Sequence, residues 1–97
     1  KMIMQKYEMM YIVKPSGEEK VKETTEKVLG ILEKYGAEVQ KHDAWGEKAL
    51  AYEIAGYNRG CYYLTSFGLK ERNIKQIHQD INYIEDVLRL MIIVKDN

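Results

Sequence analysis

The sequence has little that would support a disulfide-stabilised, membrane-spanning or strongly charged protein. Cys61 is the only cysteine among 97 residues, so no internal disulfide can form, and we expect a reducing, cytosolic setting. Fifteen basic and fifteen acidic side chains cancel, which excludes a general electrostatic attraction to phosphate or anionic lipid. Because no long apolar run or charged-then-apolar leader is present, we expect neither a membrane span nor a secretory signal. Any nucleic-acid contact must be local, or shared with a more basic partner.

The residue patterns of a catalytic or metal site are also missing. No nucleophile stands with a base and an orienting group. His42 and His78 have no Asp, Glu or Cys pair at ligand spacing, so both are expected to be surface residues. An enzyme of the acylphosphatase type would need an anion-holding loop and an arginine after the first strand, where residues 14–17 read Lys-Pro-Ser-Gly. We therefore predict that the chain is not an enzyme and holds no metal.

The composition is that of one globular domain. Hydrophobic residues make up 45% of the chain and charged residues 31%, far from the signature of disorder. A chain of this length can bury one modest core and is too short for two. We therefore predict a single domain over residues 1–97, without a linker or repeat.

The first third of the sequence predicts a strand followed by a helix. Residues 3–13 are rich in aromatic and branched side chains that alternate as they do in a strand. After Pro15, Ser16 and Glu19 have the spacing of a capping box, which would start a helix. The helix has one apolar stripe, formed by Val21, Thr25, Val28, Leu32 and Tyr35. Gly36 is expected to end the helix in a left-handed conformation.

The remainder of the sequence predicts two strands, a helix and a last strand. Residues 37–48 form a strand with one face in water, and residues 56–60 form the loop before a strong strand at 59–67. Isoleucines at intervals of three and four predict a second helix within residues 70–84. Residues 86–95 are almost continuously apolar, which predicts a strand that is central or covered on both faces.

Residues 45–54, which read Trp-Gly-Glu-Lys-Ala-Leu-Ala-Tyr-Glu-Ile, join two of the predicted strands. The stretch mixes large rings with a glycine and a lysine, and it carries no catalytic or metal signature. On residue physics alone, Trp45 and Tyr52 are expected to pack against the core. If the stretch has a function, that function is contact.

The predicted element order is β-α-β-β-α-β. It favours an α+β, ferredoxin-like fold, in which a four-stranded antiparallel sheet carries both helices on one face. Two helices can cover only one side of that sheet, although the first, third and last strands place apolar or aromatic residues on both sides. A large exposed apolar surface usually marks an interaction site. We therefore expect a partner or an oligomer to cover the open face.

Two other functions are compatible with this topology. An RNA-recognition motif, which binds single-stranded RNA, carries a basic-Gly-aromatic octamer on its third strand, whose rings stack on bases. Residues 59–66 match that octamer at Arg59, Gly60 and Tyr63 and fail at Cys61, Tyr62 and Ser66. A small ligand-binding regulatory domain has a similar topology, although the isolated Gly36 and Gly46 do not suggest a phosphate-binding loop.

Six short segments, in order along nearly the whole chain, carry a resemblance to a known family. They are Lys6-Tyr7-Glu8, residues 11–15 (Tyr-Ile-Val-Lys-Pro), Tyr35-Gly36-Ala37, Trp45-Gly46, residues 50–54 (Leu-Ala-Tyr-Glu-Ile) and Asp86-Val87-Leu88-Arg89. Together they resemble the bacterial small-ribosomal-subunit protein six family. The resemblance implies a ferredoxin-like domain that binds small-subunit ribosomal RNA in the platform region together with small-subunit protein eighteen. It further implies a cytoplasmic, ribosome-associated protein with no catalysis, no cofactor and no small-molecule substrate.

The resemblance also suggests which residues make these contacts. The side chains expected to contact RNA phosphates are Lys6, Lys48, Arg59 and Arg89. Those expected to contact the partner protein are Trp45, Leu50, Tyr52 and Tyr57. The two positions after Trp45-Gly46 are usually basic in the family, whereas here they are Glu47 and Lys48. At this block we therefore expect protein contact ahead of phosphate contact.

Overall fold

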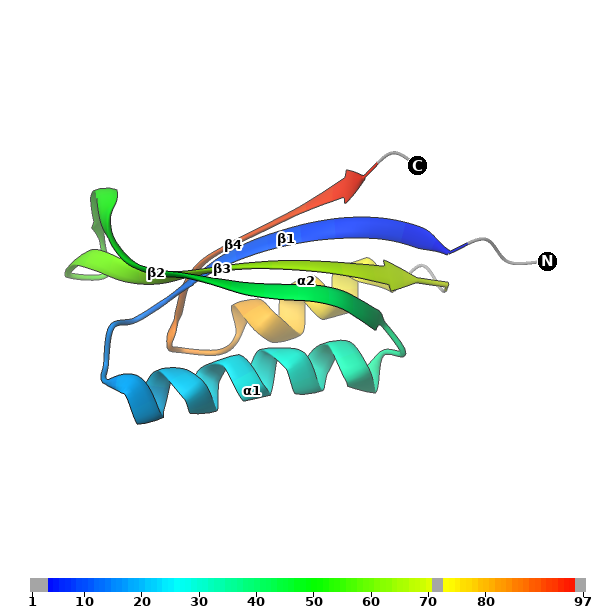
Figure 1. Ribbon diagram of the computed structural model, residues 1–97, viewed down its shortest axis with the longest axis horizontal. Helices are drawn as coiled ribbons and strands as arrows, with labels where there is room; N and C mark the ends of the chain where they lie inside the picture. The colour runs from blue at the N-terminus through cyan, green and yellow to red at the C-terminus, as the bar shows by residue number, and fades with distance from the viewer. Residues whose placement is uncertain (1–3, 71–72, 96–97) are drawn as a thin grey trace.

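A computed structural model of the chain describes residues 4–70 and 73–95. Its elements are β1 (Gln5–Val13), α1 (Glu18–Lys34), β2 (Glu38–Ile54), β3 (Tyr57–Leu69), α2 (Ile74–Asn82) and β4 (Val87–Lys95). The four strands pair antiparallel in the order β2-β3-β1-β4, and both helices lie on one side of the sheet (Figure 1). The predicted α+β, ferredoxin-like fold is confirmed.

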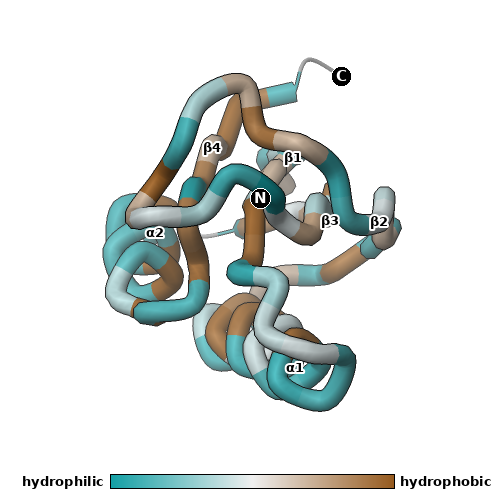
Figure 2. The backbone as a smooth tube through the Cα atoms, turned by 90° about the vertical axis from the view of Figure 1, so that its left-hand side faces the viewer, coloured by the Kyte–Doolittle hydropathy of each residue, from teal (hydrophilic) through white to brown (hydrophobic). Residues whose placement is uncertain are grey.

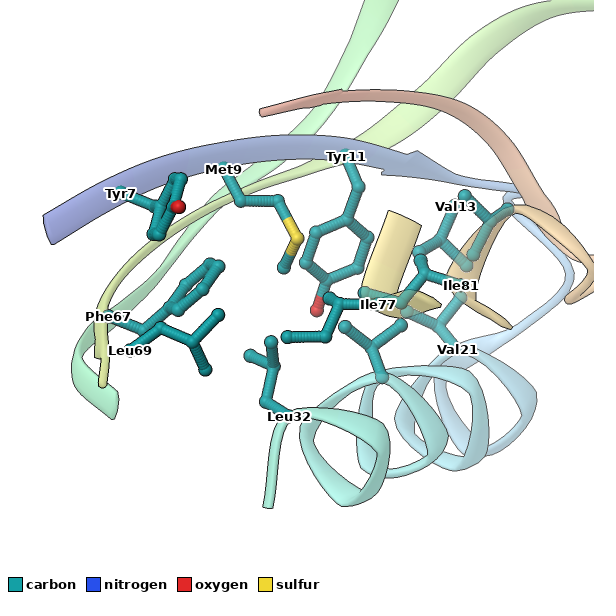
Figure 3. Close-up of a cluster of buried hydrophobic side chains, with 12 residues drawn as sticks. Tyr7, Met9, Tyr11, Val13, Val21, Leu32, Phe67, Leu69, Ile77 and Ile81 are labelled. Atoms are coloured by element: carbon teal, nitrogen blue, oxygen red, sulfur yellow. The ribbon is translucent and has the colours of Figure 1, made fainter. Parts of the chain in front are cut away.

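The core lies between the sheet and the two helices, which form a second layer when the molecule is viewed end-on (Figure 2). Alternate residues of β1 point towards the helices because successive side chains of a strand face opposite ways. Tyr7, Met9, Tyr11 and Val13 are all buried, and they meet the apolar stripes of α1 and α2 (Figure 3). Each fully buried large apolar side chain contributes roughly 1.5–3 kcal/mol. The predicted helical stripes therefore form the core.

The start of α1 differs from the prediction. Gly17, not Ser16, is the N-cap residue, and no side chain caps the helix. The Ser16 hydroxyl instead donates to the carbonyl of Lys14 at 3.3 Å. Gly17 enters the helix with φ +101, a conformation that residues with a side chain rarely adopt. The capping box is therefore wrong, because Ser16 lies one residue too early to reach the first helical amides.

Two turns rely on left-handed backbone conformations. Gly36 has φ +76 and ends α1 as predicted, while the next amide, of Ala37, donates to the carbonyl of Leu32 at 2.9 Å. Ala55 and Gly56 have φ +49 and +84, which makes a two-residue hairpin turn between β2 and β3. Because this turn is so short, the predicted loop at residues 56–60 is wrong, and β3 begins directly after it.

The sheet positions of two stretches also differ from the predictions. β4 is an edge strand, not a central one. The prediction was wrong because an apolar run shows that both faces of a strand are apolar, but it does not show which strands are its neighbours. Met91 and Ile93 remain 46% and 51% exposed. In β2, Trp45 and Tyr52 are 48% and 58% exposed, so the expectation that they pack against the core is wrong. Apolar side chains thus accumulate on the face that the helices leave open.

Candidate docking surface on the open sheet face

A groove lies on the sheet face opposite the helices. It has a volume of about 210 Å³, and its main lining residues are Ile12, Leu50, Tyr52, Tyr62, Arg89 and Met91. We call it the sheet groove. Its floor follows from strand register, since Ile12 lies opposite Tyr62 on β3 and opposite Arg89 on β4. Opposite residues of paired strands face the same side, so these side chains form a row across the sheet.

The β2–β3 hairpin supplies the remaining wall. Its far end bends away from the helix layer (Figure 1), where the pairing of β2 with β3 shifts between Ala49 and Ile54. The bend brings Tyr52 across two strands to β4, where the Arg89 guanidinium lies 5.6 Å from the Tyr52 ring centroid. The same guanidinium donates a hydrogen bond to the Tyr52 hydroxyl. The hairpin thereby connects the two outer strands of the sheet.

Gly60 permits this bend. A Cβ atom at Gly60 would lie 2.3 Å from Cγ2 of Ile12 and 3.4 Å from Cδ2 of Leu50. The first distance is far below van der Waals contact. Only glycine at this position therefore lets the side chains of Ile12 and Leu50 lie so close to the backbone of β3. The resemblance to an RNA-recognition octamer included Gly60, but the structure assigns it a packing role. Its importance was not detectable from the sequence, because the close approach depends on the bend.

The four predicted RNA-contact residues do not form one cluster. Lys6 is opposite Lys95, and Arg89 is opposite Ile12, six residues further along β1, which corresponds to about 20 Å. Lys48 lies beside the Trp45 ring, with Nζ 5.2 Å from its centroid.

Arg59 is both neutralised and turned away from the other three. Its Nε donates to Oε2 of Glu47 at 2.8 Å. Because Tyr62, three residues further along β3, lines the groove, Arg59 faces the helix side of the sheet. Arg59 therefore lies on the opposite face from Lys6 and Arg89.

The four predicted partner-contact residues are likewise divided. Leu50 and Tyr52 both line the sheet groove. Trp45 is exposed beside Lys48, whereas Tyr57 lies near Lys14, whose Nζ is 5.7 Å from the Tyr57 ring centroid. The structure thus brings two of the four together with Arg89. The other groove residues were not among the predicted contact residues; they are Met10, Ile12, Ala51, Ile54, Tyr62 and Met91.

The ring arrangement does not suit an RNA-recognition motif. In that motif the third-strand aromatic rings face outward to stack on bases. Tyr63, the ring that matches the octamer, lies on the helix side, stacked 5.3 Å from Tyr11 and 5.4 Å from His42. Of the two neighbouring tyrosines, only Tyr62 lines the open face.

His42 is not the surface residue that we expected, although His78 is exposed. Its Nε2 lies 2.8 Å from the Tyr11 hydroxyl. Burial, and secondarily the neighbouring Tyr63, raises the pKa of Tyr11, so the phenol stays protonated and donates this hydrogen bond. Partial burial lowers the pKa of His42, and Asp43 opposes that shift. Neutral His42 is therefore the acceptor beside the core.

Residues 4–70 and 73–95 contain neither a candidate metal site nor a candidate membrane-spanning helix. They contain no group of three or more His, Cys, Asp or Glu side chains placed to hold a metal ion. In the same residues, no helix has the length and apolar character needed to cross a membrane.

The chain is similar to ribosomal proteins over almost all of its length. The profile of the family described as ribosomal protein S6 matches residues 6–94. Small ribosomal subunit protein bS6 of Desulforamulus reducens is 41% identical, with 93% of this chain and 96% of the relative covered. The bS6 protein of Clostridioides difficile is 39% identical, with 94% and 99% covered.

Solved structures with the same fold include a ribosomal protein and a domain of a second protein. The crystal structure of 30S ribosomal protein S6 from Thermotoga maritima matches with a TM-score of 0.85 at 24% identity, covering 96% of this chain and 89% of that one. The C-terminal domain of MgtC from Mycobacterium tuberculosis matches with a TM-score of 0.64 at 7% identity, covering 95% and 88%. These two likenesses concern the fold alone.

The family assignment therefore rests on sequence. A family profile that spans residues 6–94 and relatives with about two-fifths identity over nearly their whole length agree with each other. Proteins of this family are structural, non-enzymatic components of the small subunit of bacterial ribosomes in the cytoplasm. The chain belongs to the ribosomal protein S6 family.

Proposed function

We propose that this small-subunit protein binds small-subunit ribosomal RNA in the platform region, together with small-subunit protein eighteen. The observation that carries the proposal is the sheet groove, an apolar surface on the open face of a chain with zero net charge. An apolar docking surface on a neutral protein suits a protein partner better than it suits RNA alone. The partner then supplies much of the positive charge that RNA binding needs.

The small number of basic side chains that are free to contact phosphate supports an RNA site shared with a partner. Among the described residues, Lys6 and Lys48 form no ion pair with a carboxylate, whereas Arg59 is paired with Glu47. Lys6 and Lys48 are therefore the stronger candidates for phosphate contact, and Arg59 is the weaker. A few lysines would give the chain alone only non-specific affinity, with a Kd on the order of 10⁻⁴–10⁻⁶ M at physiological salt.

Sedimentation of a native cell lysate through a sucrose gradient tests the assignment. We expect the chain in the peak of the small subunit at moderate salt. Reconstitution then tests the partner: a platform fragment of the ribosomal RNA should retain the chain only when protein eighteen is present. Absence from the small-subunit peak, or tight retention by the RNA without protein eighteen, would contradict the proposal.

A small ligand-binding regulatory domain is less well supported by the geometry. Pockets for small ligands usually measure about 300–1,000 Å³ and enclose most of the ligand. The sheet groove, at about 210 Å³, is smaller and open on one side. A hollow of about 490 Å³ between the start of α1 and the sheet has a suitable volume, but it is also open and is lined partly by the charged side chains of Glu18, Lys22 and Glu47. The size of the sheet groove suits one or two protein side chains.

A further inference from the structure

We propose that the sheet groove receives a segment of the protein partner that combines an apolar side chain with a carboxylate, and that the carboxylate pairs with Arg89. This inference rests on the proposed function, because it specifies the chemistry of the partner at the groove. It also changes the role expected for Arg89, from phosphate contact to protein contact. Three features of the groove support it.

The first feature is an oriented cation without a counter-charge. None of the ion pairs among the described residues involves Arg89. The Tyr52 hydroxyl accepts a hydrogen bond from the guanidinium, which lies 5.6 Å from the centroid of the Tyr52 ring. A guanidinium has five N–H donors, so most of them remain free for a two-pronged bond to a carboxylate.

The second feature is the apolar surrounding of that cation. Arg89 is the only charged side chain among the groove-lining residues, and its neighbours Ile12 and Met91 are aliphatic. A partner that fills the groove would remove water from the guanidinium. Without water, an ion pair with a carboxylate becomes stronger, and an unpaired guanidinium becomes costly. An apolar side chain without an accompanying anion would leave Arg89 buried and unpaired.

The third feature is the composition of the groove walls, which suits a peptide better than RNA. Each nucleotide brings a negative charge and a hydrated sugar, whereas the groove has one cation among aliphatic side chains and two tyrosines. Base stacking requires a free aromatic face. Of the two tyrosines in the groove, Tyr52 already contacts Arg89, and Tyr62 is half-buried in the row with Ile12. The groove therefore fits an apolar and acidic protein segment better than a nucleotide.

Isothermal titration of the chain with purified protein eighteen from the same organism tests this inference. Arg89→Gln should weaken binding by about 30-fold or more, the effect of removing one member of a desolvated charge pair. Tyr52→Phe keeps the ring but removes the hydroxyl that positions Arg89, and a loss of several-fold is expected. Lys20→Gln is the matched control, because Lys20 is an exposed residue of α1 on the other side of the molecule, and it should bind like the parent chain.

A charge exchange identifies the partner group. Arg89→Glu should abolish binding, and one acidic residue of protein eighteen, changed to lysine, should restore it. Melting curves check that each variant is folded, which we expect because Arg89 is exposed on the edge strand.

The outcomes separate the inference from the proposed function. Parent-like affinity of Arg89→Gln for protein eighteen, or a loss confined to RNA binding, would overturn the role of Arg89 and leave the partner intact. Failure of the parent chain itself to bind protein eighteen would overturn both.

Discussion

At the residue scale, the Tyr11–His42 hydrogen bond couples stability to pH. The bond needs neutral His42, and burial lowers the pKa of His42 below its usual value of 6.5. The unfolded chain therefore binds more protons than the folded chain when the pH lies between the two pKa values. Stability from this group is complete above about pH 6.5 and falls as the pH decreases towards the folded-state pKa.

We expect the melting temperature of the parent chain to decrease as the pH is lowered from 7.5 to 5.5. His42→Phe has no titrating ring at this position and should show a smaller decrease. Thermal melts followed by circular dichroism at several pH values measure both. Equal pH dependence in the two proteins would exclude His42 as the source.

A second residue-scale prediction concerns Gly60. Gly60→Ala would place its Cβ 2.3 Å from Cγ2 of Ile12, and overpacking of this kind typically costs 1–3 kcal/mol. Gly30→Ala is the matched control, since no atom lies within 4 Å of its added Cβ in the middle of α1. That variant should gain roughly 0.5–1 kcal/mol from helix propensity. Urea unfolding measures both, and a neutral Gly60→Ala would contradict the close packing.

At the element scale, the turn between β2 and β3 holds Ala55 in a strained backbone conformation that another residue would tolerate better. Ala55 has φ +49, a conformation that costs a residue with a Cβ about 1–2 kcal/mol and that asparagine tolerates better. We expect Ala55→Asn to stabilise the chain by up to about 1 kcal/mol in urea unfolding, because Asn-Gly is the preferred pair in such a turn. Ala55→Val should destabilise it, since a branched side chain is still less compatible.

The element order could be predicted because hydrophobic periodicity reports which face of each element is buried. The faces of β1, with Tyr7 to Val13 alternating, and of α1 followed directly from that signal. The capping box failed because it required Gly17 to be an ordinary helical residue. The edge position of β4 could not be predicted, since its residues Met91 and Ile93 are apolar although they are 46% and 51% exposed.

The groove was predictable only in part. The family resemblance drew attention to Leu50, Tyr52 and Arg89, but it did not place them side by side. Their contact results from the register shift in β2 and from the absence of a side chain at Gly60. Both effects depend on the three-dimensional structure, and the alternation of apolar and polar residues along a strand does not predict them.

At the scale of the whole molecule, the net charge is zero. Replacing a single lysine should therefore have a measurable effect on RNA binding. In the complex with protein eighteen, Lys6→Gln and Lys48→Gln should each reduce the slope of log K against log salt by about 0.7–0.9. Arg59→Gln should change that slope little, because Glu47 already neutralises the guanidinium. Filter binding at several salt concentrations measures the slopes. An unchanged slope for both lysine variants would remove them from the RNA site.

The strand order also determines when the groove can exist during synthesis. β4 is the last of the described strands, and its Lys95 is paired with Lys6 of β1, the first strand. The earlier strands can pair first, but Arg89 and Met91 reach the ribosomal exit only after all of them. A partner that recognises the sheet groove therefore binds only chains in which β4 has been synthesised and has paired with β1.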